Sequence, residues 1–112
     1  MIDRYSEYVS LLKIIADETR LKIIRRLAKG ECCACDLLEA LNVTQPTLSY
    51  HMKMLTACEL VIARKTGIWM RYRLNPEKSK ACSEFLREIL CNCCETTEID
   101  QEAIQDTSRC AQ

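Results

Sequence analysis

The sequence predicts a mostly helical domain that carries one small β-hairpin, and three observations support this fold class. Only two glycines and two prolines occur among the 112 residues, which argues against an all-β protein with its many tight turns. Apolar residues recur at helical spacing over most of the chain. Between residues 61 and 74 the pattern changes to β-branched and aromatic residues, and Thr66-Gly67 interrupts it as a hairpin turn would.

Four helices are expected in the first half of the chain. The side chains of Asp17 and Thr44 can accept hydrogen bonds from free backbone amides, so each is a suitable N-cap for the helix that follows it. Gly30 is the expected stop of the second helix. Pro46 falls in the first turn of the fourth helix, where proline is tolerated. The expected helices span residues 5–15, residues 20–27, residues 35–41 and the segment that begins after Thr44.

The second half of the chain predicts a hairpin and one further helix. The hairpin strands are expected at residues 61–65 and 69–74, where β-branched and aromatic side chains concentrate. Asn75-Pro76 then turns the chain into a last helix over residues 77–93.

This order of elements is that of a winged helix-turn-helix. Leu48, Met52 and Leu55 form one stripe of the fourth helix, which we expect to face the core. The opposite, polar face of that helix would enter the major groove of double-stranded DNA. We expect residues 1–95 to form the winged helix-turn-helix domain and residues 96–112 to be a polar, flexible tail.

Charge is unevenly distributed along a chain whose formal net charge is zero. Residues 42–80 carry seven basic and two acidic side chains, whereas residues 81–112 carry two basic and seven acidic ones. A basic segment of this kind indicates a polyanion as partner.

The residues that contact DNA are expected on the fourth helix and at the tip of the hairpin. Small hydroxyls, an amide, a tyrosine and a lysine suit a surface that reads base edges, and a basic tip would reach phosphates. His51, the only histidine, lies beside the apolar stripe, so we interpret it first as a hydrogen-bonded boundary residue and second as a DNA contact. The candidate DNA-binding residues are Gln45, Thr47, Ser49, Tyr50, His51, Lys53, Arg64 and Lys65.

The nine cysteines indicate soft-metal or redox chemistry in place of a disulfide framework. Their number is odd, no export signal precedes them, and most of them cluster as Cys-Cys-Ala-Cys and Cys-Asn-Cys-Cys. A cytoplasmic chain with clustered thiols more often binds a soft metal or carries out redox chemistry. The primary metal-site candidates are Cys32, Cys33 and Cys35, and the secondary candidates are Cys91, Cys93 and Cys94.

Helix geometry constrains the first thiol cluster. Residues two apart on a helix point in nearly opposite directions, so Cys33 and Cys35 share one ion only if Cys33 lies in the turn that enters the third helix. A helix N-terminus favours thiolates, and we therefore expect lowered thiol pKa values there. Cys58 and Cys82 are interpreted as buried free thiols, and Cys110 as a further donor from the tail.

Five sequence blocks between Ala16 and Leu74 form an ordered pattern. They are Asp17-Glu18-Thr19-Arg20-Leu21-Lys22-Ile23-Ile24, Gly30-Glu31, Cys33-Ala34-Cys35-Asp36-Leu37, Gln45-Pro46-Thr47-Leu48-Ser49-Tyr50-His51-Met52-Lys53 and Leu60-Val61-x-x-Arg64-Lys65-x-Gly67-x-Trp69-x-x-Tyr72-x-Leu74. This pattern resembles the ArsR/SmtB family of metal-sensing repressors. The resemblance implies a homodimer that binds a palindromic operator and leaves it when a ligand binds, with the first and last helices as the dimerisation surface. Glu59 stands where the family usually has a glycine, so the local turn geometry is expected to differ from that of the family while the fold stays the same.

Within that family, Cys33-x-Cys35-Asp36-Leu37 is similar to the arsenical-resistance sensors of arsenite and antimonite and also to the cadmium and lead sensors. Residues 1–31 contain no cysteine, although the cadmium-type site would draw thiols from that segment. The zinc-type site needs histidines that the chain lacks. Arsenic(III) needs only three soft ligands, so we expect an arsenic(III)-responsive repressor, with antimony(III) as a second inducer and cadmium or lead as less suited ones.

Other functions remain open at this point. A repressor of the same fold could sense thiol oxidation through disulfides or persulfides, and a metal-storage or protein-docking module would not need DNA. A thiol oxidoreductase would need its Cys-x-x-Cys at the start of a helix that follows a strand in a βαβ pattern. The sequence predicts no such unit, so we expect no enzyme. No apolar run approaches the length of a membrane span, and we expect a cytoplasmic protein.

Overall fold

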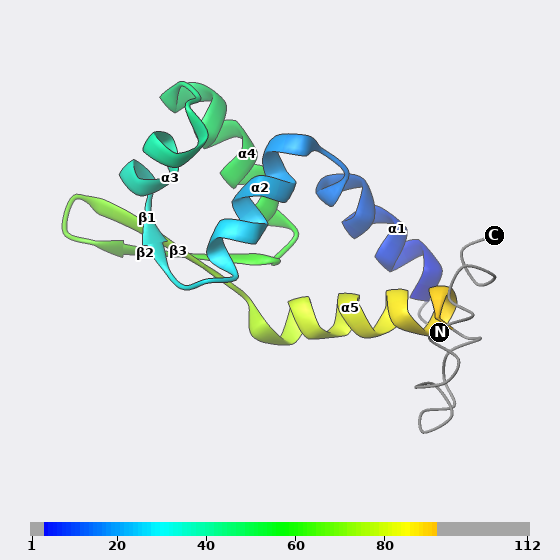
Figure 1. Ribbon diagram of the computed structural model, residues 1–112. Coiled ribbons are helices and arrows are strands. Elements are labelled where there is room, and N and C mark those ends of the chain that lie inside the picture. The colour runs from blue at the N-terminus through cyan, green and yellow to red at the C-terminus, as the bar shows by residue number, and fades with distance from the viewer. Residues whose placement is uncertain (1–3, 92–112) are drawn as a thin grey trace, which may run out of the picture. The chain divides into compact units, whose positions relative to one another are not determined.

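A computed structural model describes residues 4–91 of the chain, and Figure 1 shows the arrangement of the elements along it. In chain order they are α1 (Arg4–Ile15), α2 (Glu18–Leu27), β1 (Cys32–Cys33), α3 (Ala34–Leu41), α4 (Gln45–Ala57), β2 (Val61–Thr66), β3 (Trp69–Leu74) and α5 (Pro76–Leu90). The mostly helical fold with a β-hairpin is therefore confirmed. The chain divides into two compact units, residues 1–79 and residues 80–112, and each is described by itself.

The predicted caps form at both helix starts where they were expected. The Asp17 carboxylate accepts a hydrogen bond from the backbone amide of Arg20 at 3.0 Å, and the Thr44 hydroxyl accepts one from the amide of Thr47 at 3.3 Å. These bonds satisfy amides that have no partner inside their helix, which is why α2 and α4 begin at these points. After α2 ends at Leu27, Gly30 adopts a positive φ of 142° that side chains disfavour.

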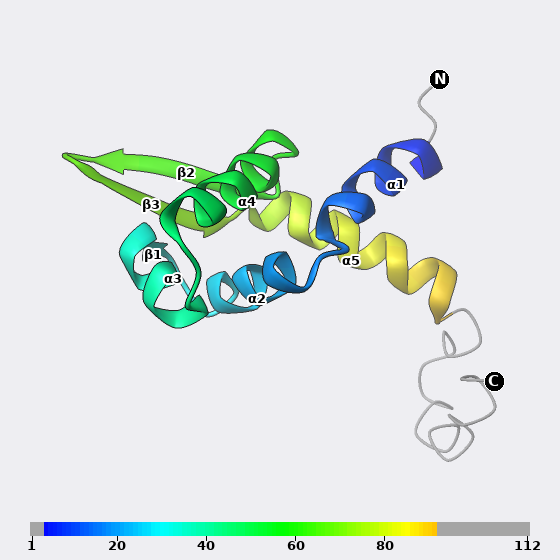
Figure 2. The ribbon, with the colours of Figure 1, turned by 90° about the horizontal axis from the view of Figure 1, so that it is seen from above.

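The sheet has three strands, one more than the sequence predicts. The hairpin strands β2 and β3 pair antiparallel, and β1 pairs with the other edge of β3, giving the order β1-β3-β2. Strand β1 has only two residues, so no alternation of polar and apolar side chains could reveal it. Both views show the tips of β2 and β3 projecting away from the helices, as a wing does (Figures 1 and 2).

The core of the first unit lies where the helices meet the base of the sheet. The stripe predicted on α4, Leu48, Met52 and Leu55, is fully buried. Leu21 of α2 is in contrast exposed, because the buried residues of that helix are Arg20, Ile23 and Leu27. The buried apolar residues of this unit are Leu11, Ile23, Leu27, Cys32, Leu37, Leu48, Met52, Leu55, Leu60 and Val61.

The helix-turn-helix consists of α3, a three-residue turn and α4. Asn42 ends α3 in the left-handed conformation, with φ of 56°, and its amide donates to the carbonyl of Leu38 at 3.0 Å. Asparagine tolerates this conformation better than most residues, so it serves as the C-cap that glycine often provides. The turn aligns α4 with its polar face exposed. None of the helices within residues 4–91 has both the length and the apolar composition needed to cross a membrane.

Glu59 also has a positive φ, 67°, in the turn between α4 and β2. Its amide donates to the carbonyl of Thr56 at 3.0 Å, and its own carbonyl accepts from the side-chain amide of Asn75 at 2.9 Å. A glutamate pays a steric penalty in this conformation that glycine does not. The turn therefore keeps its left-handed geometry without the glycine expected there.

Replacing Glu59 with glycine should raise the free energy of unfolding by about 0.5–1 kcal/mol, because relief of the left-handed strain exceeds the added freedom of the unfolded chain. Urea denaturation followed by circular dichroism measures this change. Glu39→Gly, at an exposed position within α3, is the control and should lose about 1 kcal/mol. A loss of similar size for Glu59→Gly would contradict the prediction.

Candidate thiol site and DNA-reading surface

The outer face of α4 presents the polar side chains that the sequence assigns to DNA. The residues on this face are exposed, whereas Leu48, Met52 and Leu55 point to the core. Arg64 and Lys65 are exposed on β2, the first strand of the hairpin. The exposed candidates are Gln45, Thr47, Ser49, Tyr50, Lys53, Arg64 and Lys65. Their role on DNA remains a prediction.

His51 is the hydrogen-bonded boundary residue that the sequence favours. Its side chain is 12% exposed, and its Nδ1 accepts a hydrogen bond from Nε of Arg20 at 3.0 Å. The Asp17 carboxylate lies 4.0 Å from the same nitrogen. Hydrogen bonding by the Arg20 amide is the largest effect on the Asp17 carboxyl and lowers its pKa, and the positive charge of the Arg20 guanidinium acts in the same direction.

The hairpin carries a salt bridge that the sequence does not reveal. The Arg64 guanidinium donates to both carboxylate oxygens of Glu31, from Nη2 at 3.0 Å to each and from Nε at 3.3 Å to one. Glu31 immediately precedes β1, which holds Cys32 and Cys33, so this salt bridge connects the start of β1 to β2 across the intervening strand β3. The two residues are 33 positions apart, and no local pattern signals such a pair.

The sheet register places one thiol in line with the wing arginines. Cys33 on β1 is opposite Arg71 on β3, and Arg71 is opposite Arg64 on β2. Residues that pair across neighbouring strands share one face of a sheet. Cys33 therefore lies in the same row as two basic residues of the hairpin.

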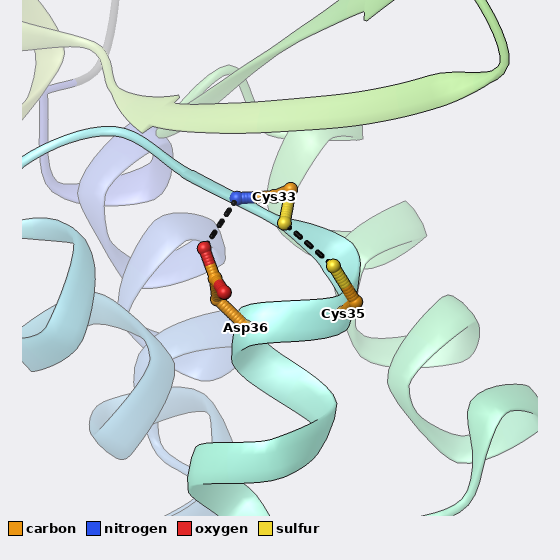
Figure 3. Close-up of side chains that lie close together, drawn as sticks. All are labelled: Cys33, Cys35 and Asp36. Atoms are coloured by element: carbon orange, nitrogen blue, oxygen red, sulfur yellow. Dashed lines mark hydrogen bonds between the residues drawn. The ribbon is translucent and has the colours of Figure 1, made fainter.

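Cys33 and Cys35 come together where the chain enters α3. Cys33 is the N-cap, with the extended backbone angles φ −88° and ψ 167°, and Cys35 lies in the first turn. Their sulfur atoms are 2.7 Å apart (Figure 3). The condition derived from helix geometry, that Cys33 must precede the helix, is thus met.

Asp36 is the third member of this cluster, and the sequence analysis did not include it. Its Oδ2 accepts a hydrogen bond from the backbone amide of Cys33 at 3.5 Å, as Figure 3 shows. One ligand atom each from Cys33, Cys35 and Asp36 falls within 4.8 Å of the others. We refer to these three residues as the α3 cluster.

Cys32 lies apart from the α3 cluster. Successive residues of a strand point to opposite faces, and Cys32 is 1% exposed in the core. Removal from water raises the pKa of its thiol. In this conformation the structure therefore brings together two of the three primary candidate thiols.

The expectation of lowered thiol pKa values at this helix N-terminus is wrong for Cys35. The hydrogen bond with the Cys33 thiol is the largest of several effects that raise the pKa of Cys35, and removal from water and the nearby Asp36 carboxylate act in the same direction. A thiolate at Cys35 could no longer donate a hydrogen bond to the Cys33 sulfur, and it would be repelled by the negative charge of Asp36. These neighbours outweigh the favourable end of the helix dipole.

Among residues 4–91, no further cysteine belongs to the α3 cluster. Cys91 is exposed just beyond α5, whereas Cys93, Cys94 and Cys110 lie outside the described residues. Cys58 is half-buried, and its thiol donates to the carbonyl of Leu55 at 3.3 Å. Cys82 is buried, as expected for a structural thiol.

The chain is similar in sequence to bacterial regulatory proteins of the arsR family. Residues 17–63 match the model of the family described as bacterial regulatory protein, arsR family. An arsenical resistance operon repressor of Staphylococcus xylosus is 51% identical over 73 residues, which cover 65% of this chain and 70% of that protein. A repressor of the same description from Staphylococcus aureus is 52% identical over 71 residues, covering 63% and 68%.

Solved structures agree with the fold. HlyU from Vibrio cholerae N16961 is 33% identical, with a TM-score of 0.68, and the match covers 81% of this chain and 99% of that one. The likeness therefore covers most of the chain.

Removing the Cys33 thiol should lower the pKa of Cys35 and make Cys35 react faster with an alkylating agent near neutral pH, because the thiol–thiol hydrogen bond is lost. Iodoacetamide labelling of the Cys33→Ala variant between pH 7 and 10, quantified for each peptide by mass spectrometry, measures the rate. Cys58→Ala, which removes a distant thiol, is the control and should leave the rate at Cys35 unchanged. An unaltered rate at Cys35 in Cys33→Ala would show that the two thiols are not hydrogen-bonded.

Proposed function

The chain belongs to the ArsR family of bacterial regulatory proteins, and from this premise we propose that it is an arsenic(III)-responsive repressor that binds a palindromic operator as a homodimer. Its relatives are transcription regulators, so it is a regulator of this family and not an enzyme. The proposal concerns the inducer, the thiols that bind it and the surfaces that bind DNA and a second copy.

One observation carries the choice of inducer site. The sulfurs of Cys33 and Cys35 lie 2.7 Å apart at the start of α3, and α3 is the first helix of the helix-turn-helix. Two thiols this close can bind one ion with little movement of the chain. An ion bound there acts on the element that precedes the recognition helix, α4.

The third ligand to the ion is expected to differ from the third group that lies beside the two thiols in this structure. Asp36 already lies within reach, but a carboxylate oxygen is a hard ligand and trivalent arsenic prefers sulfur. Cys32 would supply the third sulfur only by leaving the core and the pairing of β1 with β3. We propose that arsenic(III) draws Cys32 out in this way, so that binding detaches the entering turn from the hairpin.

Proton balance favours arsenite over cadmium or lead. Each arsenic–sulfur bond forms as a hydroxide of arsenous acid leaves as water together with the thiol proton. A divalent cation must instead displace those protons into solution, and this is harder at Cys32 and Cys35, whose thiol pKa values are raised. Antimony(III) shares the chemistry of arsenic(III) and is the natural second inducer.

The proposed DNA and dimer surfaces follow from exposed side chains. The polar face of α4 and the basic strand β2 suit a major groove and its phosphates. Large apolar side chains are exposed on α1, at Tyr5 and Val9, and on α5, at Ile89 and Leu90. Apolar groups in such positions are typical of protein interfaces, which supports a homodimer that uses the first and last helices.

The sheet offers a second route from the thiols to DNA. Glu31 lies two residues before Cys33 and holds Arg64 by a two-pronged salt bridge. A movement of the entering turn would carry Glu31 with it and displace Arg64 from a DNA-ready position. The inducer thus acts on the hairpin as well as on the recognition helix.

A repressor that senses thiol oxidation is the second candidate, and the same sulfur distance favours it. Hydrogen peroxide would oxidise Cys33 and Cys35 to a disulfide. The two thiols give up two protons and two electrons, which reduce the peroxide to two molecules of water. Release from DNA by peroxide but not by arsenite would select this alternative. The secondary cluster, Cys91, Cys93 and Cys94, remains a further candidate for the inducer site.

Replacing Cys33 and Cys35 together with serine should leave DNA affinity unchanged and abolish release by arsenite, because the inducer loses its first two ligands. Fluorescence anisotropy of a duplex from the chain's own promoter region, titrated with and without arsenite, measures both effects. X-ray absorption of the arsenite-bound wild type should show three sulfurs around arsenic if Cys32 is recruited.

The matched control replaces Cys91, Cys93 and Cys94 with serine and should still respond to arsenite. Normal release from the Cys33/Cys35 variant, combined with loss of release from this control, would transfer the inducer site to the secondary cluster. Two sulfurs and one oxygen around arsenic would instead show that Cys32 is not recruited, and the same measurement on Asp36→Ala would distinguish the Asp36 carboxylate from a retained hydroxide.

Replacing Glu31 with glutamine should release Arg64 from the position that suits DNA, so that the inducer-free protein binds operator DNA about threefold more weakly, as expected for the loss of a two-pronged surface pair. The weakening of DNA binding by arsenite should become smaller, while arsenite affinity, followed by thiol absorbance, stays the same. Glu39→Gln makes the same charge change at an exposed site on α3 and controls for general electrostatics. Equal behaviour of the two variants would exclude the hairpin route.

A further inference from the structure

Arg20 is the one charged side chain that is buried among the described residues, with 8% of its surface exposed. A guanidinium is costly to bury unless its donors are satisfied. Its Nη1 donates to the carbonyl of Ile14 at 3.1 Å, and its Nε donates to Nδ1 of His51 at 3.0 Å. One side chain on α2 therefore joins the last turn of α1 to the recognition helix.

The same guanidinium also meets the exposed face of α4. Its central carbon lies 5.5 Å from the centre of the Tyr50 ring, within range of a cation–π interaction. The Tyr50 and His51 rings meet edge to face at 5.5 Å. Tyr50 is 57% exposed on the predicted DNA surface. The buried Arg20 therefore contacts the inner side of a candidate DNA-binding side chain.

We propose that Arg20 is a positioning residue for DNA recognition, which orients α4 and Tyr50 through the unprotonated Nδ1 of His51, and that DNA binding weakens when His51 gains a proton. The proposal concerns DNA binding without any inducer. It is therefore independent of the thiol site and of the identity of the ion.

Hydrogen-bond chemistry gives the reason. Nδ1 can accept from Arg20 only while it carries a lone pair, which requires a neutral imidazole with its proton on Nε2. A protonated ring has donors at both nitrogens, so Nδ1 would turn a second positive group toward the guanidinium. The Arg20–His51 bond would then be lost.

The groups that face His51 determine where the protonated ring goes. They are Asp17 in the turn before α2, Arg20 on α2 and Tyr50 on α4. Repulsion by Arg20 and attraction by the Asp17 carboxylate, 4.0 Å away, both favour a ring that turns from the guanidinium toward Asp17. Arg20 would lose its link to α4, and Tyr50 would lose its support.

The sign of the effect separates this proposal from general electrostatics. Acid makes any protein more positive, which ordinarily strengthens binding to the phosphate backbone. Here acid should weaken binding. His51 is the only histidine of the chain, and histidine is the side chain that ordinarily changes charge between pH 5 and 8.

The experiment measures the affinity of the full chain for a duplex from its own promoter region between pH 5.5 and 8.0, by fluorescence anisotropy at constant ionic strength. Wild type should bind about tenfold more weakly at pH 5.5 than at pH 7.5, a change typical of coupling between two sites. His51→Gln offers an acceptor that takes up no proton, so its affinity should lack this loss in acid. Arg20→Lys replaces the two separate donor nitrogens of Arg20, Nε and Nη1, with a single ammonium and removes the planar guanidinium, so this variant should bind weakly at every pH.

Circular dichroism and sedimentation at each pH ensure that fold and oligomeric state are constant. Wild-type binding that is unchanged or tighter in acid would overturn the proposal, as would a His51→Gln variant with the wild-type pH profile. A second measurement needs no variant, because the single imidazole gives one set of nuclear magnetic resonance signals. A neutral ring with its proton on Nδ1 would contradict the acceptor role.

Discussion

The proposed chemistry depends on the extended conformation of Cys33, the last residue before α3. A helical residue at this position would direct its side chain away from Cys35. Because the backbone is still extended there, the two sulfurs converge, and the Cys33 amide remains available to the Asp36 carboxylate. The same conformation allows Cys32 and Cys33 to pair with β3. One backbone feature thus forms the thiol pair and joins it to the sheet.

The connection between the thiol pair and the sheet is the part of the structure that the proposed inducer would change. Cys32 contributes to the core and Cys33 to the α3 cluster, so adjacent residues serve opposite faces of the sheet. An ion that requires both sulfurs competes with core packing and strand pairing. Part of the free energy of ion binding would offset the cost of separating β1 from β3. Binding at the thiols would in this way change the position of the elements proposed to bind DNA.

Most of the fold could be predicted because its signals are local. The caps Asp17 and Thr44, the apolar stripe of α4 and the hairpin turn at Gly67 each depend on residues near one another in sequence. The turn itself lies one residue later than predicted, at Gly67-Ile68, because Thr66 still pairs with Trp69. Strand β1 could not be predicted, since two residues have no periodicity and the strand exists only because β3 has a free edge.

The candidate site was less accessible to sequence reasoning for the same physical reason. The proximity of Cys33 to Cys35 follows from spacing once the helix start is known, but the burial of Cys32 follows from its tertiary position. The rule that helix N-termini lower thiol pKa values considers the helix alone, and the neighbours of Cys35 reverse it. The bond between Arg20 and His51 spans 31 positions, so no local pattern reveals it.

Helix α4, the proposed recognition helix, thus adjoins two groups of different chemistry. On one side, α3 and the thiols precede it along the chain; on the other, Arg20 contacts it from α2 through one hydrogen bond and one aromatic ring. A soft ion has no affinity for the guanidinium network, and a proton at His51 does not involve the sulfurs. Under the two proposals, disturbing either neighbour of α4 would misalign the helix, and operator binding would respond to each signal separately.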